Sequence, residues 1–421
     1  MQQSKIYKYF YITGVFCFLF LWDIKVDFYQ PRFLIVLPLF ALFFLKDHFL
    51  NNFKNNFLIV LIPFIITLHI LILSFFYEYD LNKRDFFGLT LLLSIALLLT
   101  EKTKKIYLYI ERSISLFVYI FVALYIFYIL TNNVDFNINC YNGWFSNTKF
   151  FFVENSHFSI ISVPIICFYF LKFCEIKKYE SIDLFNLIFF LIFLIISFIN
   201  FSTTFLLGLI VSLLFFIIKK YKNILFVIIS LIIIFSSFII ITNYEQCNDR
   251  SFGSAKKINN YFKYKSMSEL QRNEFALTNK IDLQIINMSI ETYLVSLEIT
   301  LKSLREKPFG IGFNKYYLSH NEYISKVKLL DSDIKKNNIY DGSNNFSKII
   351  TEFGLFGILI ILILPFIYFR KKNISNIEYF LLILIGMQFL RGVGYFNGGY
   401  ILAYLLVLKE FFKILLKKLN W

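Results

Sequence analysis

A segment before one apolar run carries two side chains that could move a proton at a membrane surface. In Phe151-Phe-Val-Glu-Asn-Ser-His-Phe158, Glu154 and His157 are three residues apart and would share one side of a starting helix. A carboxylate there can act as a general base, and histidine titrates near neutral pH. The alternative is an ordinary helix start, in which Asn155 or Ser156 is the cap and the histidine reaches the interface.

Arginines stand where polar segments meet apolar runs. Arg305 lies just before a glycine-rich turn, and Arg391 lies at the end of an apolar run. The planar guanidinium matches the oxygens of a phosphate. A salt bridge or a lipid head group is the alternative partner, because an unpaired arginine near a membrane is costly. Arg250 and Arg272 stand earlier in the same polar stretch as Arg305.

That polar stretch, from Asn243 to Phe346, ends in a series of small motifs. Pro308-Phe-Gly-Ile-Gly312 allows a tight turn or a close backbone approach to a ligand. Asp341-Gly-Ser-Asn-Asn345 supplies helix caps, and a helix N-terminus attracts anions. Glu352 follows on the same face, where a pair with Lys348 is the simpler interpretation.

These motifs give three groups of candidate residues. The candidate bases are Glu154, His157 and His320, although a loop histidine is usually only solvated. The candidates for binding a phosphate group, which the resemblance given below makes a diphosphate, are Arg305, Arg391, Ser343, Asn344 and Asn345. The candidates for contact with the rest of a ligand are Gly310, Gly312, Arg250, Arg272 and Glu352.

Other chemistry has little support in the sequence. There is no P-loop, GxGxxG, HExxH or Cys/His metal cluster, and Asp331-Ser-Asp333 only imitates a metal-binding DxD. His69, inside an apolar run, is interpreted as a packed polar residue. Cys140 and Cys247 could form a disulfide in an oxidising compartment, or could be two unrelated thiols.

The elements that position these residues are membrane helices. Hydrophobic residues make up 58% of the 421 residues and charged residues 17%, which indicates a polytopic membrane protein. The net charge of +15 does not indicate nucleic-acid binding, because the basic residues lie mostly at the ends of apolar runs. The apolar runs are 7–22, 33–45, 57–77, 86–100, 113–131, 158–173, 184–201, 203–219, 223–242, 347–369, 377–391 and 398–415.

Twelve runs predict an all-α fold of about twelve transmembrane helices, with a tight hairpin around Asn200-Phe-Ser-Thr-Thr204. The first run is interpreted as an uncleaved span, since no small-residue cleavage site follows it. Short loops on one side hold 21 Lys and Arg against six on the other, which places both termini in the cytoplasm. The predicted organisation is a membrane domain over 1–242, a large outer loop over 243–346 between the ninth and tenth spans, and a membrane domain over 347–421.

In order and placement, the motifs resemble those of the Wzy O-antigen polymerase and O-antigen ligase superfamily. Pro308-x-Gly-x-Gly312 is followed by a polar cap and then by Ile349-Ile-Thr-Glu-Phe-Gly-Leu-Phe-Gly357. The segment 151–158 and the turn Ser202-Thr-Thr204 are similar to those of the polymerases in that group. The resemblance covers roughly residues 140 to 365 and the predicted topology.

The resemblance implies a GT-C-type glycosyltransferase of the bacterial inner membrane. Such an enzyme moves a glycan from undecaprenyl diphosphate to a hydroxyl of the next lipid-linked repeat unit, without metal, nucleotide or other cofactor. It implies an O-antigen or capsule-type polysaccharide as product. The partners implied are the lipid-linked oligosaccharides, membrane lipid, a chain-length regulator and a flippase, and no nucleic acid.

Two departures refine this expectation. Ligases of the superfamily place His before the Asn of the last loop segment, but Ser343 precedes Asn344 here, which favours a polymerase. Some polymerases carry arginine-rich repeats in two outer loops, whereas the loop 132–157 holds only Lys149. A ligase is the alternative within the same chemistry, and a flippase or transporter for lipid-linked sugars is the alternative outside it.

Overall fold

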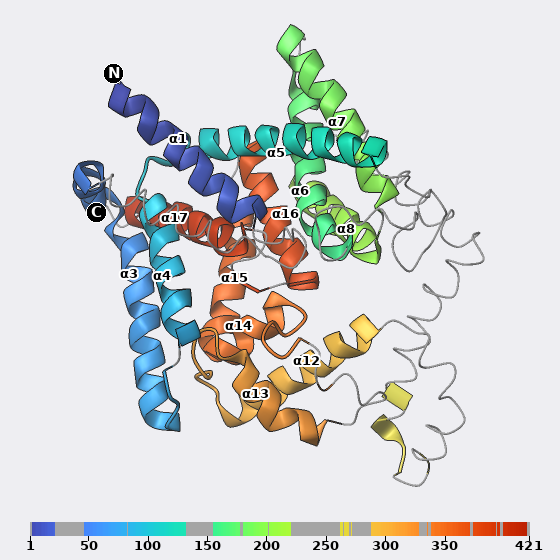
Figure 1. The fold of residues 1–421 in the computed structure, drawn as a ribbon. Coiled ribbons are helices and arrows are strands. Elements are labelled where there is room, and N and C mark those ends of the chain that lie inside the picture. Colours follow the sequence, from blue (N-terminus) through green and yellow to red (C-terminus); the bar gives the residue numbers. More distant parts are fainter. Residues whose placement is uncertain are drawn as a thin grey trace.

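In a computed structural model, the chain is helical throughout the part that is described, with no strand (Figure 1). The fold class predicted from the sequence, an all-α protein with several apolar helices, agrees with this part. The described residues are 2–21, 46–81, 83–131, 155–176, 180–200, 202–219, 262–263, 265–268, 271, 288–327, 335, 338–370, 374–392, 394–395 and 399–418.

The helices of the first half are α1 (Gln2–Phe16) with the π-helix η1 (Cys17–Leu21), α3 (Lys46–Tyr77), α4 (Lys83–Leu98), α5 (Thr103–Thr131), α6 (Asn155–Glu175), α7 (Ser181–Ile199) and α8 (Thr203–Lys219). Those of the second half are α12 (Met288–Glu306), α13 (Tyr316–Tyr323) with the 3-10 turn η3 (Ile324–Lys326), α14 (Asn345–Phe353), α15 (Leu355–Arg370), α16 (Asn376–Leu390) and α17 (Tyr400–Lys418).

Four of the described helices are long and apolar enough to cross a membrane: Ile59–Tyr77, Thr103–Thr131, Ser156–Glu175 and Ser181–Ile199. Five further apolar helices are shorter. The expected runs 33–45 and 223–242 lie outside the described residues. The multi-pass character of the chain therefore has structural support, while the number twelve and the loop layout stay predictions.

The run from 347 to 369, expected as one span, is two helices. Gly354 ends α14 with a φ of 59°, and its N–H donates to the carbonyl of Ile350 at 2.8 Å. The next N–H, of Leu355, donates to the carbonyl of Pro308, also at 2.8 Å. The apolar helix α15 therefore begins only at Leu355, and α14 packs with the polar stretch before it.

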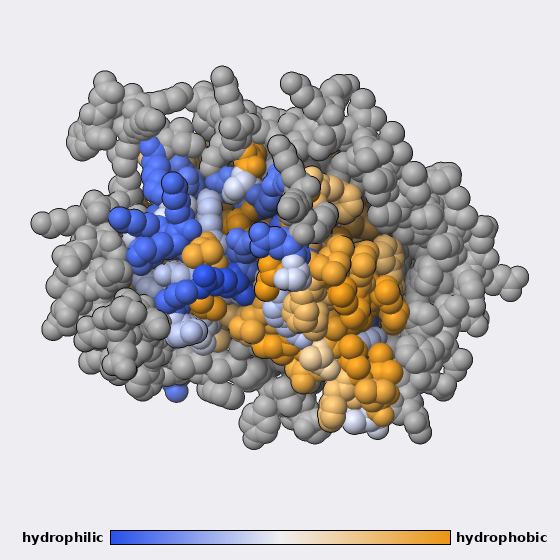
Figure 2. All heavy atoms as spheres, turned by 90° about the horizontal axis from the view of Figure 1, so that it is seen from above, coloured by the Kyte–Doolittle hydropathy of each residue, from blue (hydrophilic) through white to orange (hydrophobic). Residues whose placement is uncertain are grey.

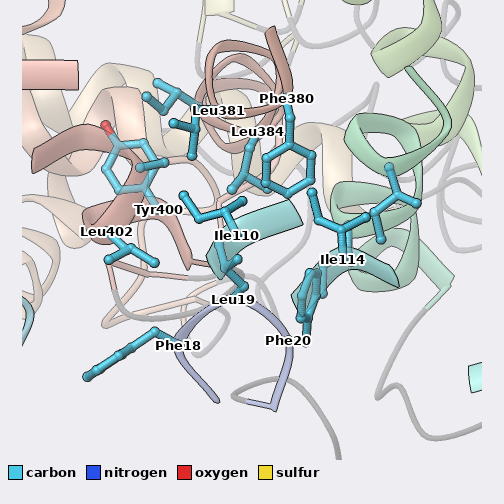
Figure 3. Packing of buried hydrophobic residues seen from close by; sticks show 14 of the residues in the cluster. Phe18, Leu19, Phe20, Ile110, Ile114, Phe380, Leu381, Leu384, Tyr400 and Leu402 are labelled. Atoms are coloured by element: carbon cyan, nitrogen blue, oxygen red, sulfur yellow. The ribbon is translucent and has the colours of Figure 1, made fainter. Parts of the chain in front are cut away.

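Helix α16 runs through the centre of the hydrophobic core. It packs against α5, α6, α8, α14 and α17, and the side chains of α16 are buried along almost its whole length. Figure 3 shows Phe380, Leu381 and Leu384 of α16 beside Ile110 and Ile114 of α5, with residues of η1 and α17 close by. The carboxyl end of α16 is thereby fixed next to α14.

Polar contacts gather one set of helix ends together. Tyr107 Oη donates to the Glu378 carboxylate at 2.9 Å, joining the starts of α5 and α16. Lys172 pairs with Glu111 at 2.7 Å, and Lys409 Nζ donates to the carbonyl of Leu99 at 2.5 Å. These are ends that the distribution of Lys and Arg places in the cytoplasm.

The surface seen from above in Figure 1 is divided in two. Figure 2 shows hydrophilic residues gathered on one side of this face and hydrophobic residues on the other. Helices α5 and α7, which lie on this face, both expose large apolar side chains, among them Ile120, Phe127, Ile188 and Ile195. Exposed apolar flanks of this kind suit contact with lipid tails.

Candidate functional site

The glycine motif 308–312 lies against the carboxyl end of α14. The N–H of Ile311 donates to the carbonyl of Thr351 at 3.2 Å, and that of Gly312 donates to the carbonyl of Glu352 at 2.9 Å. A Cβ on Gly310, where φ is +83°, would lie 2.2 Å from the Glu352 carbonyl oxygen. The close approach expected at these glycines is therefore made to a helix end, and it needs no ligand to explain it.

Glu352 holds the next turn of the loop in place. Its carboxylate is fully buried and accepts hydrogen bonds from the backbone N–H groups of Asn314 at 2.7 Å and Tyr316 at 3.1 Å. Burial raises the pKa of Glu352 to about 7, against the opposing effect of Lys348. In this structure the residue expected to contact substrate is an internal acceptor that orders residues 314–316.

Lys348 is a buried cation beside Glu352. Its side chain is 2% exposed, and its Nζ donates to the carbonyl of Tyr340 at 2.8 Å. The same Nζ lies 3.7 Å from the Asp341 carboxylate and 4.9 Å from the centre of the Tyr395 ring. The four-residue spacing of Lys348 and Glu352 predicts that they pair, and their charged groups are 3.9 Å apart. No local sequence pattern predicts that Tyr395 is a neighbour of Lys348.

The cap at 343–345 is an N-cap, as its residue types predict. Asn344 Oδ1 accepts from the N–H of Ser347 at 2.7 Å. The amide of Asn345 donates to Gln388 Oε1 at 3.1 Å, and the carbonyl of Ser343 accepts from the N–H of Gly392 at 3.1 Å. All three cap residues are buried, and the Asn345 side chain and the Ser343 backbone carbonyl join α14 to the end of α16.

Arg391 is brought to this cap, as the sequence leads us to expect. It is the C-cap residue of α16 and is half-buried, and the following Gly392 bonds to Ser343. A Cβ at Gly392 would lie 2.4 Å from the backbone nitrogen of Asn345, so only glycine permits this contact. Arg305 is exposed in the last turn of α12, next to the 308–312 motif.

Two of the three candidate bases, His320 and His157, lie within the described residues, on α13 and α6. His320 is buried in α13 and burial lowers its pKa, which keeps its ring neutral at pH 7. His157 is half-buried in the first turn of α6. The first turns of α6 meet Ser202, just before α8, where Ser159 Oγ and Ser202 Oγ are 2.7 Å apart. Glu154, Arg250, Arg272, Cys140 and Cys247 lie outside the described residues.

An apolar groove of about 530 Å³ runs between α3, α15 and α17. Ile65, Leu68, Leu359 and Leu405 are among the side chains that line it. At its end near the polar loop it is bounded by His69, Phe313, Phe353 and Tyr395. His69 is packed, as expected: its ring stacks on Phe353, and its Nε2 lies 3.1 Å from the Phe309 carbonyl oxygen. The groove thus ends where Tyr395 meets Lys348.

Two comparisons with known proteins gave one match between them, and it is to a family model. No curated protein matches the chain. The family model described as O-antigen ligase (Wzy_C) matches residues 188–362, from within α7 to within α15. The matched segment contains α12, α13, α14 and the motif 308–312, whereas the Arg391 turn and the walls of the groove from α3 and α17 lie outside it. Residues 188–362 therefore match an O-antigen ligase family domain, in agreement with the superfamily expected from the motifs.

Proposed function

We propose that this protein is a polysaccharide polymerase that joins oligosaccharide repeat units carried on undecaprenyl diphosphate at the outer face of the cytoplasmic membrane. The proposal rests on two observations taken together. An O-antigen ligase family domain supplies α14, and an apolar groove ends beside the buried Lys348 of that helix. A lipid-linked sugar needs such a junction between apolar and polar surroundings.

The groove suits the isoprenoid tail of the donor. Tails gain little free energy on leaving the surrounding lipid for an apolar protein surface, so such a groove serves to position the lipid rather than to bind it tightly. A tail lying along α3 and α15 would bring its head group to Tyr395 and Phe313 at the end of the groove.

The diphosphate is the leaving group, and negative charge develops on it as the glycosidic bond breaks. Arg391 lies next to the α14 cap and is half-buried, and it is the cation that we assign to the diphosphate. Lys348, on the same helix α14, is buried and paired with Asp341 and Glu352. Fixed cations at this position stabilise the transition state, and removing one such contact typically lowers kcat by about 10²–10³-fold. Arg305 is included in the proposal as a cation that reaches the same diphosphate.

The acceptor hydroxyl loses its proton as it attacks the anomeric carbon. We assign the proton acceptor to Glu154 or His157 rather than to His320, because His320 is buried within α13. No metal or nucleotide is required in this scheme, since the donor is already activated by its diphosphate.

A ligase is the second candidate, since the matching family model is described as O-antigen ligase. Ser343, where ligases carry His, favours the polymerase. The test offers the purified protein undecaprenyl-diphosphate-linked repeat units in detergent, with no nucleotide, and separately adds lipid A–core as acceptor. We expect a ladder of longer lipid-linked glycans in both reactions. Transfer to lipid A–core without any ladder would identify a ligase, and the absence of both products would contradict glycosyl transfer.

A further inference from the structure

Tyr317 and Tyr340 form an aromatic pair on the surface of the polar loop. Their ring centres are 5.7 Å apart and their planes are inclined by 49°. Tyr340 is 49% exposed and Tyr317 is half-buried, so one ring supports the other while the outer ring presents a face. The carboxylate of Asp341 follows immediately, and its side chain is 46% exposed.

This pair is fixed to the head of the apolar groove. The buried Lys348 donates to the carbonyl of Tyr340 at 2.8 Å and lies 3.7 Å from the Asp341 carboxylate. Gly394, with φ +99°, packs so closely that a Cβ there would lie 2.9 Å from Asp341 Oδ1. The next residue, Tyr395, lines the groove. Asp341 and Tyr340 are therefore joined through Lys348 and Gly394 to Tyr395, a wall residue of the groove.

The chemistry of these side chains selects among ligand classes. A carboxylate disfavours an anion, and the ammonium of Lys348 at 3.7 Å disfavours a cation. A neutral sugar ring fits both neighbours, because its C–H face packs on an aromatic ring while its hydroxyls donate to a carboxylate.

We propose that Tyr317, Tyr340 and Asp341 form a carbohydrate subsite that holds a sugar ring of the lipid-linked glycan close to its diphosphate. The assignment to that glycan rests on the function proposed above. Tyr340 stacks on the sugar, Tyr317 buttresses Tyr340, and Asp341 accepts hydrogen bonds from sugar hydroxyls.

The test measures binding of the repeat-unit oligosaccharide after its release from the lipid, by saturation-transfer NMR and calorimetry on the full-length protein in detergent. Tyr340→Ala should raise Kd about tenfold. Tyr340→Phe should keep most of the affinity, and Asp341→Asn should weaken binding several-fold. Tyr9→Ala removes a tyrosine of α1 that is more exposed than Tyr340 and should leave Kd unchanged. Thermal unfolding of each variant shows that it is folded.

Polymerisation assays on the same preparations separate the two claims. Wild-type protein that binds the free glycan but makes no longer products would keep the subsite and overturn the polymerase. Wild-type protein that polymerises, while folded Tyr340→Ala and Asp341→Asn variants bind the glycan as it does, would overturn the subsite alone. Failure of both binding and polymerisation in the wild type would overturn both.

Discussion

The ammonium of Lys315 lies 3.6 Å from the carboxylate of Asp85, and both side chains are almost completely buried. Lys315 follows the 308–312 motif, whereas Asp85 stands in the first turn of α4. Lys315 also donates to the carbonyl of Asp80 at 3.2 Å. The pair therefore fastens the polar loop to the α3–α4 connection, on the opposite side of residues 314–316 from Glu352.

Removing one member of this pair should destabilise the protein strongly. Lys315→Met or Asp85→Leu alone leaves an uncompensated buried charge, which typically costs about 3–5 kcal/mol. The double variant should lose much less than the sum of the two. Thermal unfolding in detergent measures each value, and Lys413→Met, which breaks an exposed pair with Glu410, should cost under about 1 kcal/mol. Additive losses in the double variant would contradict the pairing.

The features that the sequence predicts correctly are those set by local residue types. The helix break expected at 200–204 is present, because Asn200 ends α7 and Ser202 Oγ accepts from the N–H of Phe205 at the start of α8. The expected tight packing of the two helices is not seen: α7 packs against α5 and α6, and α8 packs against α6 and α16. The cap at Asn344 follows from the same local chemistry. The placement of Arg391 beside that cap follows from the order of the apolar runs, which brings the outer ends of neighbouring helices together.

The features that sequence reasoning missed depend on contacts between distant segments. The break at Gly354 is fixed by Pro308, forty-six positions earlier, which no local pattern reveals. The polar residues Lys348, Thr351 and Glu352 all precede Gly354, and this is the one local sign that the apolar helix begins after it. Gly310 of the 308–312 motif packs against the carboxyl end of α14. The spacing of the glycines in the sequence does not distinguish such packing from the binding of a ligand. Lys348 meets Tyr395 only because α16 returns the chain to α14.

Stability should depend on pH through Glu352. Its pKa in the folded protein is raised to about 7, so the folded state holds its proton where the unfolded chain has released it. The free energy of unfolding should therefore fall as pH rises from about 4.5 to about 7, by at most about 3 kcal/mol. Glu352→Gln should remove this dependence of the unfolding free energy on pH. The control Glu322→Gln, which changes an exposed side chain, should leave the dependence as it is in the wild type. Equal slopes in Glu352→Gln and wild type would refute the assignment.

The two helix-packing glycines make a matched comparison. Gly310→Ala places a methyl group 2.2 Å from a backbone oxygen at a positive φ, so a loss of more than about 3 kcal/mol is expected. Gly14→Ala meets only Leu98 side-chain atoms at 3.5 Å within α1 and should be neutral or stabilising by up to about 1 kcal/mol. Both are measured by thermal unfolding, and a tolerated Gly310→Ala would contradict the close packing of the loop on α14.

Arg391 and Arg305 test the diphosphate role most directly. Arg391→Ala and Arg305→Ala should each abolish or strongly reduce polymerisation, by about 10²–10³-fold in kcat, because a fixed cation is lost from the leaving group. Arg391→Lys should recover part of the rate, since it restores the charge without the planar fork. Arg112→Ala removes an exposed arginine at the other end of the helices and should leave the rate unchanged. Expression and thermal unfolding are compared for every variant. Normal chain lengths from folded Arg391→Ala and Arg305→Ala proteins would show that the diphosphate is held elsewhere.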